Sequence, residues 1–313
     1  MDELILDILK QLRDSSQGAL DTHQLEMLIN SHNSGIDSSA HSTEREKLIP
    51  KRAILPYFLQ VKQNNDELWQ SWNVTPELEE RFIRSVRMKP RRTASGVATI
   101  TVITRPHTCS SNCIYCPCDL RMPKSYLANE PACQRAELTF FDPYVQVSAR
   151  LQALHQMGHS TDKVELIVLG GTWSDYPESY QYWFIKELFR ALNEWPNAPQ
   201  HIQEHLNWYT SFGLQNSEEA LSSFVAEQQK AIFDDNTTYN QAFHKLYDTS
   251  QPHQNAWSQM QSTYDQLVEQ QHVNETAAAR VVGLVIETRP DTITPDNLRM
   301  FRQLGCTKIQ IGI

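Results

Sequence analysis

The chain has 313 residues and a net charge of −9, and 40% of its residues are hydrophobic. A chain of this length can bury a sizeable core and is expected to hold more than one domain, while its acidic balance argues against a general polyanion binder. The six cysteines do not form the pattern of a disulfide framework, which in secreted domains is dense and short.

The first 90 residues carry helical patterns. Their start lacks the cationic stretch and long apolar run of a secretory signal, and no later stretch is apolar for long enough to span a membrane. Apolar residues between 4 and 12 share one helical face, and a second helix is expected around 25–28 after Asp21 as its cap. Residues 31–43 have the composition of a linker. A further helix should follow Thr75, with Pro76 at its first position, so we predict a helical domain over 1–90.

Basic residues are concentrated at the end of this domain. The segment 81–92 holds six Lys or Arg and no acidic residue. Such a segment suits contact with a nucleic-acid backbone, because each neutralised phosphate releases condensed counterions. The alternative is an exposed helix face with ordinary solubilising charge. The predicted nucleic-acid contacts are Arg84, Arg87, Lys89, Arg91 and Arg92.

Beyond residue 95 the pattern changes to alternating strands and helices. Runs rich in β-branched residues predict strands at 97–103, 164–169 and 281–286, and a fourth begins at 308–313. Helices are expected at 142–157, 177–193 and 294–305. This alternation indicates parallel βα units with right-handed crossovers, so we assign residues 91–313 to an α/β fold, a partial barrel.

Residues 197–279 interrupt this alternation. Between 197 and 280 there are ten acidic and three basic residues, with much Gln, Asn, Ser and His. We expect an acidic insertion that is largely helical and partly disordered. Its role is not indicated by its sequence.

The most distinctive motif follows the first predicted strand. Cys109, Cys113 and Cys116 have the spacing C-x3-C-x2-C, so three thiolates in one loop can hold three corners of a [4Fe–4S] cluster. Such a cluster normally takes four cysteines, so one iron would be open to another ligand. Cys118 and Cys133 leave the ligand count undecided. Cys118 could close the cluster, or complete a structural zinc site with Cys109 and Cys113.

This spacing resembles that of radical-SAM enzymes, in which the open iron binds the amino and carboxylate groups of S-adenosylmethionine. Reduction of the cluster then cleaves that molecule to a deoxyadenosyl radical. Tyr115, just before the last cysteine of the motif, would offer a ring on which adenine packs; a core tyrosine would look the same. An oxygen-sensitive cluster favours the reducing cytoplasm.

Further motifs follow the second and third predicted strands. Because the ends of parallel strands meet on one face of a barrel, all these loops should converge on one site. Gly170, Gly171 and Thr172 would allow a backbone edge to approach the methionine part of the cofactor, or would only form a tight turn. Glu287 and Arg289 could bind ribose hydroxyls or a carboxylate, with a buried salt bridge as the alternative.

A set of segments carries a closer resemblance. In order they are 87–96, Pro106-His107 before Cys109, Cys116-Pro117, 129–136, 158–172 and 286–291. Together they resemble the catalytic subunit of Elongator and its bacterial and archaeal relatives, which are radical-SAM tRNA uridine carboxymethyl/acetyltransferases. The resemblance covers about residues 85–190 and 281–313. Cys118 departs from it, because the family tends to have Gly or Asn there.

The resemblance implies an enzyme that modifies C5 of the wobble uridine of tRNA with S-adenosylmethionine and acetyl-CoA. The basic segment would then contact tRNA. In the family the rest of the barrel and an acetyl-CoA domain follow, so we expect this chain to be a fragment that is not necessarily active alone. No catalytic residue is predicted, and a homo-oligomer is left open.

Two other functions stay open from the sequence. One is a different radical-SAM reaction, either an oxidoreductase or another tRNA-modifying enzyme. The other is a non-catalytic tRNA-binding protein whose cysteine loop binds zinc for structure alone.

Overall fold

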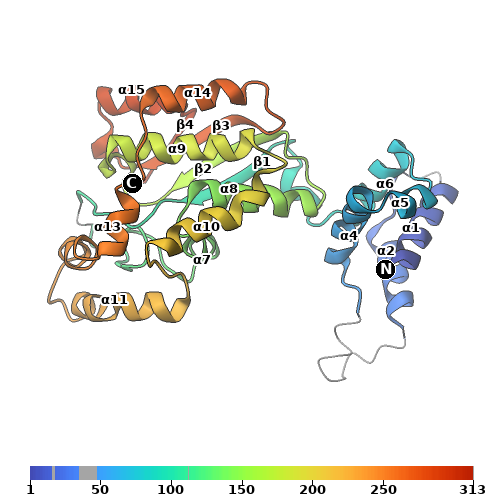
Figure 1. Ribbon diagram of the computed structural model, residues 1–313, viewed down its shortest axis with the longest axis horizontal. Coiled ribbons are helices and arrows are strands. Elements are labelled where there is room, and N and C mark those ends of the chain that lie inside the picture. The colour runs from blue at the N-terminus through green and yellow to red at the C-terminus, as the bar shows by residue number, and fades with distance from the viewer. Residues whose placement is uncertain (16–17, 35–47, 112, 313) are drawn as a thin grey trace. The chain divides into compact units, whose positions relative to one another are not determined.

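The computed structural model describes residues 1–15, 18–34, 48–111 and 113–312. The chain divides into two compact units (Figure 1). The first is Met1–Ser95 with Ala153–Ser160, and the second is Gly96–Gln152 with Thr161–Ile313. Within the described ranges, no helix combines the length and apolarity that crossing a bilayer requires.

The first unit is built from helices. They are α1 (Asp2–Asp14), α2 (Thr22–Asn33), α4 (Lys51–Asn64), α5 (Asp66–Ser71), α6 (Pro76–Val86) and the short η1 (Pro90–Thr93). The predicted start of α2 is confirmed by a capping box between Asp21 and Gln24. The predicted start of α6 is confirmed too, because the Thr75 hydroxyl accepts a hydrogen bond from the backbone N–H of Leu78 at 3.2 Å.

Two expectations for this unit need correction. The linker expected over 31–43 begins later, because residues 31–33 form the last turn of α2; residues 35–43 lie outside the described residues. The helices α4 and α5 were not predicted. Pro56 inside α4 weakens its sequence pattern, yet Phe58 is fully buried and stacks on Phe82 with ring centroids 4.1 Å apart. Burial of aromatic surface therefore outweighs local helix propensity here.

The second unit is organised by a four-stranded parallel sheet. Its strands are β1 (Ala98–Ile103), β2 (Lys163–Leu169), β3 (Arg280–Thr288) and β4 (Lys308–Ile311), and they are arranged in sequence order. Ile103 pairs with Leu169 and Val168 with Ile286, so the strand ends are in register at one edge. All four predicted strands and their parallel pairing are confirmed. The extension of this sheet into a barrel stays a prediction.

Helices connect the strands. They are α7 (Pro131–Leu138), α8 (Pro143–Gln156), η2 (Trp173–Asp175), α9 (Glu178–Asn193), η5 (Pro290–Thr292) and α15 (Pro295–Gln303). The three helices predicted here correspond to α8, α9 and α15, whereas the short α7 was not predicted. The helix α9 packs against β3 and against α14 of the insertion (Figure 1). Its buried face includes Phe184, Ile185 and Leu188.

The insertion consists of helices joined by short turns, and all its residues are described, so the expected partial disorder is wrong. It contains η3 (Ala198–His201), α10 (Ile202–Ser211), α11 (Glu218–Phe233), α12 (Tyr239–Phe243), η4 (His244–Asp248), α13 (Gln251–Trp257) and α14 (Tyr264–Asn274). Ser217, Thr238 and Thr263 cap three of these helices with their hydroxyls. Figure 1 shows α11 at the edge of this unit that lies farthest from β3 and β4. Caps and buried aromatic rings order a segment whose average composition is polar.

Candidate functional site

The loops after the parallel strands converge on one cavity of about 140 Å³, called here the cysteine cavity. Its walls come from the segments after β1, β2, β3 and β4. They include every residue that the sequence assigned to metal or cofactor binding: Cys109, Cys113, Tyr115, Cys116, Gly170, Gly171, Thr172, Glu287 and Arg289. Ser111, Lys124, Ser125, Thr288 and Gly312 complete the lining. The structure thus brings these residues together, while their roles stay predictions.

Each cysteine of the motif has its own hydroxyl partner. The Sγ atom of Cys109 lies 3.3 Å from Oγ1 of Thr172, and that of Cys116 lies 3.0 Å from Oγ of Ser125. The Sγ atom of Cys113 lies 3.2 Å from Oγ of Ser111, and this hydrogen bond lowers the pKa of the Cys113 thiol. Hydroxyls that donate to sulfur stabilise thiolates, which are the form that binds metal.

Glu287, near the end of β3, and Arg289, just after it, do not pair with each other. The Arg289 guanidinium pairs with Asp291 at 2.7 Å and lies 3.7 Å from the Cys113 sulfur. The Glu287 carboxylate accepts a hydrogen bond from the Tyr126 hydroxyl, and burial raises the pKa of Glu287. A salt bridge between the two residues is therefore not what holds them at the cavity. Arg289 instead offers a positive charge to the cysteine sulfurs.

The two glycines after β2 differ in the space around them, and their predicted role in cofactor binding stays a prediction. A Cβ atom on Gly170 would stand 1.9 Å from Oγ1 of Thr104, so the neighbouring strand end requires glycine at this position. Gly171 is less constrained, because its nearest neighbour would be the backbone nitrogen of Lys124 at 3.8 Å. Of the two, only Gly171 leaves room for a ligand to approach.

Cys118 and Cys133 lie away from the cysteine cavity. Cys118 packs beside a cluster that includes Leu120 and Tyr247, and burial raises the pKa of its thiol. Cys133 is fully buried, and burial raises its pKa to about 12. Neither thiol lines the cavity that the other three share. In this conformation the arrangement offers three sulfur ligands and not four.

The donor set of the cysteine cavity fits an iron–sulfur cluster. Three thiols line one partly open cavity, and the cations of Lys124 and Arg289 line the same cavity and offset the negative charge of thiolates. Among the described residues, no three His, Cys, Asp or Glu side chains already stand close enough to hold a single metal ion. In a cubane cluster each cysteine sulfur binds a different iron. The three sulfurs would therefore stand farther apart than the ligands of a single metal ion do.

Sequence reasoning missed several residues of this site. Lys124 is 3% exposed and donates from Nζ to the backbone carbonyl of Ser111 at 3.0 Å, bridging the two halves of the loop. Ser111, Ser125 and Tyr126 were missed as well. Residues of an irregular loop leave no periodic signal, so only the fold reveals their contacts.

His107, next to the motif, lies behind the loop. Its Nε2 atom is 3.0 Å from the backbone carbonyl of Asp175, and its ring stacks on Tyr176. Burial and the neighbouring Arg105 lower its pKa to about 4. His107 therefore packs against the segment that follows β2 and does not line the cysteine cavity.

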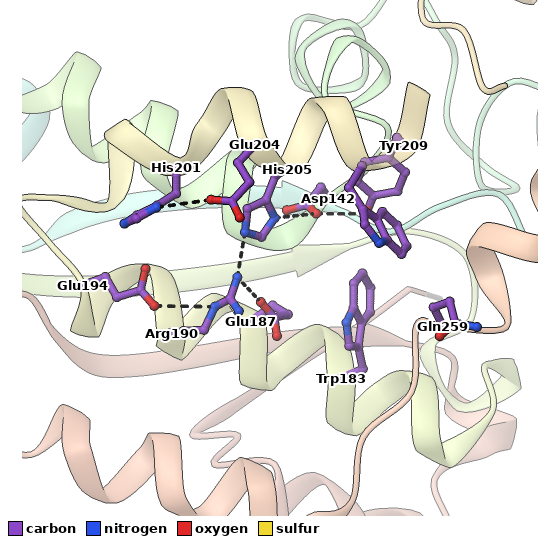
Figure 2. A pocket seen from close by; sticks show the side chains of 11 residues that line it. Asp142, Trp183, Glu187, Arg190, Glu194, His201, Glu204, His205, Tyr209 and Gln259 are labelled. Atoms are coloured by element: carbon purple, nitrogen blue, oxygen red, sulfur yellow. Dashed lines mark hydrogen bonds and ion pairs between the residues drawn. The ribbon is translucent and has the colours of Figure 1, made fainter. Parts of the chain in front are cut away.

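A second, larger cavity of about 390 Å³ lies between α9 and α10 (Figure 2). Its charged and histidine side chains are paired with one another. His205 lies between Asp142, at 3.2 Å from Nδ1, and Arg190, at 2.7 Å from Nε2. Because a guanidinium only donates, Nε2 accepts and Nδ1 carries the proton toward Asp142. Asp142 also accepts from the Tyr209 hydroxyl at 2.9 Å. This network joins the insertion to the helices beside the sheet.

The predicted nucleic-acid contacts lie in the first unit. Arg84 pairs with Glu80 at 2.7 Å within α6. Lys89, Arg91 and Arg92 are exposed around η1, and within the described residues none of these three takes part in an ion pair. Arg87 is half-buried and directly follows α6. The uncompensated charge is thus concentrated between 89 and 92.

The fold and the cavity define an α/β protein with a cysteine-rich site at the ends of parallel strands. No protein-family model matches the chain. Over 245 residues it is 31% identical to the tRNA uridine(34) acetyltransferase of Methanocaldococcus infernus, covering 76% of this chain and 33% of that protein. It is 31% identical to the Dehalococcoides mccartyi protein of the same name, covering 72% and 34%. It is 28% identical to Elongator complex protein 3 of Schizosaccharomyces pombe, covering 75% and 33%.

Over about three quarters of its length the chain therefore resembles tRNA uridine(34) acetyltransferases and Elongator complex protein 3, and the predicted resemblance is confirmed. It spans about a third of the length of the curated relatives that it matches. A solved structure of the archaeal Methanocaldococcus infernus Elp3 with an N-terminal deletion covers 69% of this chain and 28% of its own. The identity in that comparison is 26% and the TM-score is 0.36.

Proposed function

We propose that this chain is the cluster-binding and tRNA-binding part of an enzyme that modifies C5 of the wobble uridine in tRNA. Support comes from the convergence of all three motif cysteines on the cysteine cavity, together with relatives named for acetyl transfer to tRNA uridine 34. The site would hold a [4Fe–4S] cluster and S-adenosylmethionine. Acetyl-CoA would be the second substrate of a complete enzyme, which we place in the cytoplasm.

Cys109, Cys113 and Cys116 would hold the cluster as thiolates. At Cys113 the Ser111 hydroxyl and the Arg289 guanidinium favour that charge state. When bound, the reduced cluster with S-adenosylmethionine supplies an organic radical, which is chemistry that no side chain can provide.

The other residues of the cysteine cavity would orient the bound cofactor. Gly171 leaves open space on one wall, and Glu287 presents an acceptor to ribose hydroxyls or to an ammonium group. Tyr115 is 76% exposed at the mouth of the loop, so its ring is available to stack. Lys124 and Arg289 would attract the carboxylate of S-adenosylmethionine electrostatically.

The experiment is anaerobic reconstitution of the purified chain with iron and sulfide, followed by electron paramagnetic resonance of the reduced protein. We expect a brown [4Fe–4S] protein whose spectrum changes when S-adenosylmethionine is added. A spectrum that S-adenosylmethionine does not alter contradicts the proposal. So does a colourless protein that is equally stable with zinc.

A further inference from the structure

The acidic insertion contacts the cysteine loop directly, through side chains that bond to its backbone. Asn240, at the start of α12, forms both bonds of a side-chain clamp on Cys109. Its Oδ1 accepts from the Cys109 backbone N–H at 3.1 Å, and its Nδ2 donates to the Cys109 carbonyl at 2.7 Å. Both backbone groups of Cys109 are thus bonded to one side chain, as they would be to a neighbouring residue in a paired strand.

A second clamp acts further along the loop. Gln229 of α11 accepts from the Leu120 backbone N–H at 2.8 Å and donates to the Cys118 carbonyl at 2.8 Å. This irregular loop pairs part of its own backbone, as in the bond from the Met122 N–H to the Asp119 carbonyl, and buried groups left unpaired are costly. Two amide side chains from the insertion therefore satisfy four backbone groups of the loop.

Two tyrosines complete these contacts. The Tyr239 hydroxyl donates to the Met122 carbonyl at 2.8 Å, and the Tyr247 hydroxyl donates to the Leu120 carbonyl at 2.7 Å. Leu120 is fully buried in an apolar cluster whose other buried members all come from the insertion: Val225, Tyr239, Ala242, Phe243 and Tyr247. Apolar burial and hydrogen bonds thus act on the same stretch of loop.

The insertion is itself anchored beside the sheet at both ends. At its start, His205 and Tyr209 bond to Asp142, as Figure 2 shows. At its end, Asn274 donates to Asn193 of α9 at 2.7 Å, and its Oδ1 accepts from the backbone N–H of Val281 in β3 at 2.8 Å. Because both ends of the insertion are bonded beside the sheet, the insertion can hold the cysteine loop at a fixed place relative to the sheet.

We propose that the helices of the insertion, residues 198–274, are the scaffold of the cysteine loop, and that Asn240, Gln229, Tyr239 and Tyr247 are positioning residues for it. Every bond described above is made by the protein alone, so the scaffold acts before any cluster is loaded. The inference deepens the proposed function, because a loop of fixed shape presents its three thiols at one cavity. It does not depend on which reaction follows.

Hydrogen–deuterium exchange of the cluster-free chain tests this proposal. Asn240→Asp keeps the acceptor for the Cys109 N–H and removes the donor to its carbonyl. The double variant Tyr239→Phe/Tyr247→Phe removes two hydroxyls and keeps the rings. In each variant we expect amides in 109–122 to exchange about tenfold faster or more. Amides of β2 and α9 should be unchanged. Asn255→Ala is the matched control, because its side chain bonds to Gln251 within the insertion and not to the loop.

If the exchange rates of the loop amides are unchanged in both variants, the scaffold proposal is overturned. Equal acceleration in the loop and in β2 would overturn it too, because the effect would then be global. A second measurement is iron loss to a chelator after reconstitution, which should be several-fold faster in Asn240→Asp. If the wild type takes up no cluster but loop exchange is faster in the variants as expected, the proposed function fails and the scaffold proposal stands. If the cluster binds and loop exchange does not respond, the scaffold alone fails.

Discussion

Gly170 and Thr104, which follow the neighbouring strands β2 and β1, approach each other so closely that only glycine fits. A Cβ atom at position 170 would stand 1.9 Å from Oγ1 and 3.1 Å from Cβ of Thr104. The Thr104 hydroxyl is in turn fixed 2.8 Å from the Tyr176 hydroxyl. This contact joins the two strand ends from which the cysteine loop and the glycine pair depart.

Gly170→Ala should therefore destabilise the chain by about 1–3 kcal/mol, as overpacking of a buried contact does. Urea unfolding measures this. Gly171→Ala is the matched control and should change stability by less than about 0.5 kcal/mol, because its nearest neighbours lie at ordinary contact distance. Adding Thr104→Ala to Gly170→Ala should cost less than the sum of the two single changes. Full additivity would show that the two residues do not clash.

The exposed charge between 89 and 92 leads to a prediction about tRNA binding. Replacing both Arg91 and Arg92 by Ala should weaken binding and flatten its dependence on salt. Each lost phosphate contact lowers the slope of log affinity against log salt by about 0.7–0.9. Fluorescence anisotropy with labelled tRNA at several salt concentrations measures the slope.

The control for this prediction is Lys10→Ala/Arg52→Ala, which removes the same charge from exposed positions elsewhere in the first unit. It should leave the slope near that of the wild type. If both double variants flatten the slope equally, binding reflects net charge alone. The segment around η1 would then have no special part in it.

Stability should fall at mildly acidic pH because of His253 in the insertion. Burial and, secondarily, Arg105 lower the pKa of His253 to about 4, from the ordinary 6.5. Below pH 6.5 the unfolded chain binds a proton that the folded chain takes up only near pH 4. The contribution of the neutral ring, complete above pH 6.5, is therefore lost as the pH falls from 6.5 to 4, by about 2–3 kcal/mol.

Urea unfolding at pH 7 and at pH 4.5 measures this loss. His253→Phe keeps a ring against Phe224 and Trp257 and removes the titrating group. The free energy of unfolding of this variant should fall less between the two pH values than that of the wild type. Parallel curves for the two proteins would assign the acid sensitivity to other groups.

The strands and the helices beside them could be predicted from sequence because their signals are local. β2, for example, alternates buried and half-exposed residues, and Thr75-Pro76 marks the start of α6 by itself. The cysteine motif and the two loops that share its cavity were found for the same reason, because each directly follows a strong strand.

The insertion could not be interpreted in this way. Its order depends on contacts between residues far apart in the chain, such as the clamp of Asn240 on Cys109, 131 positions away. The packing constraint at Gly170 was missed for a related reason, since it comes from Thr104, which follows another strand. Side chains that act on distant backbone leave no periodicity in the sequence.

The number of cysteines that hold the cluster tests the central claim most directly. We expect Cys109→Ser, Cys113→Ser and Cys116→Ser each to lose most of the iron after anaerobic reconstitution. Cys118→Ser and Cys133→Ser should keep the iron content of the wild type and its spectral response to S-adenosylmethionine. If Cys118→Ser loses the cluster, or if Cys109→Ser retains it in full, the account of three thiols around one cavity with an open iron is contradicted.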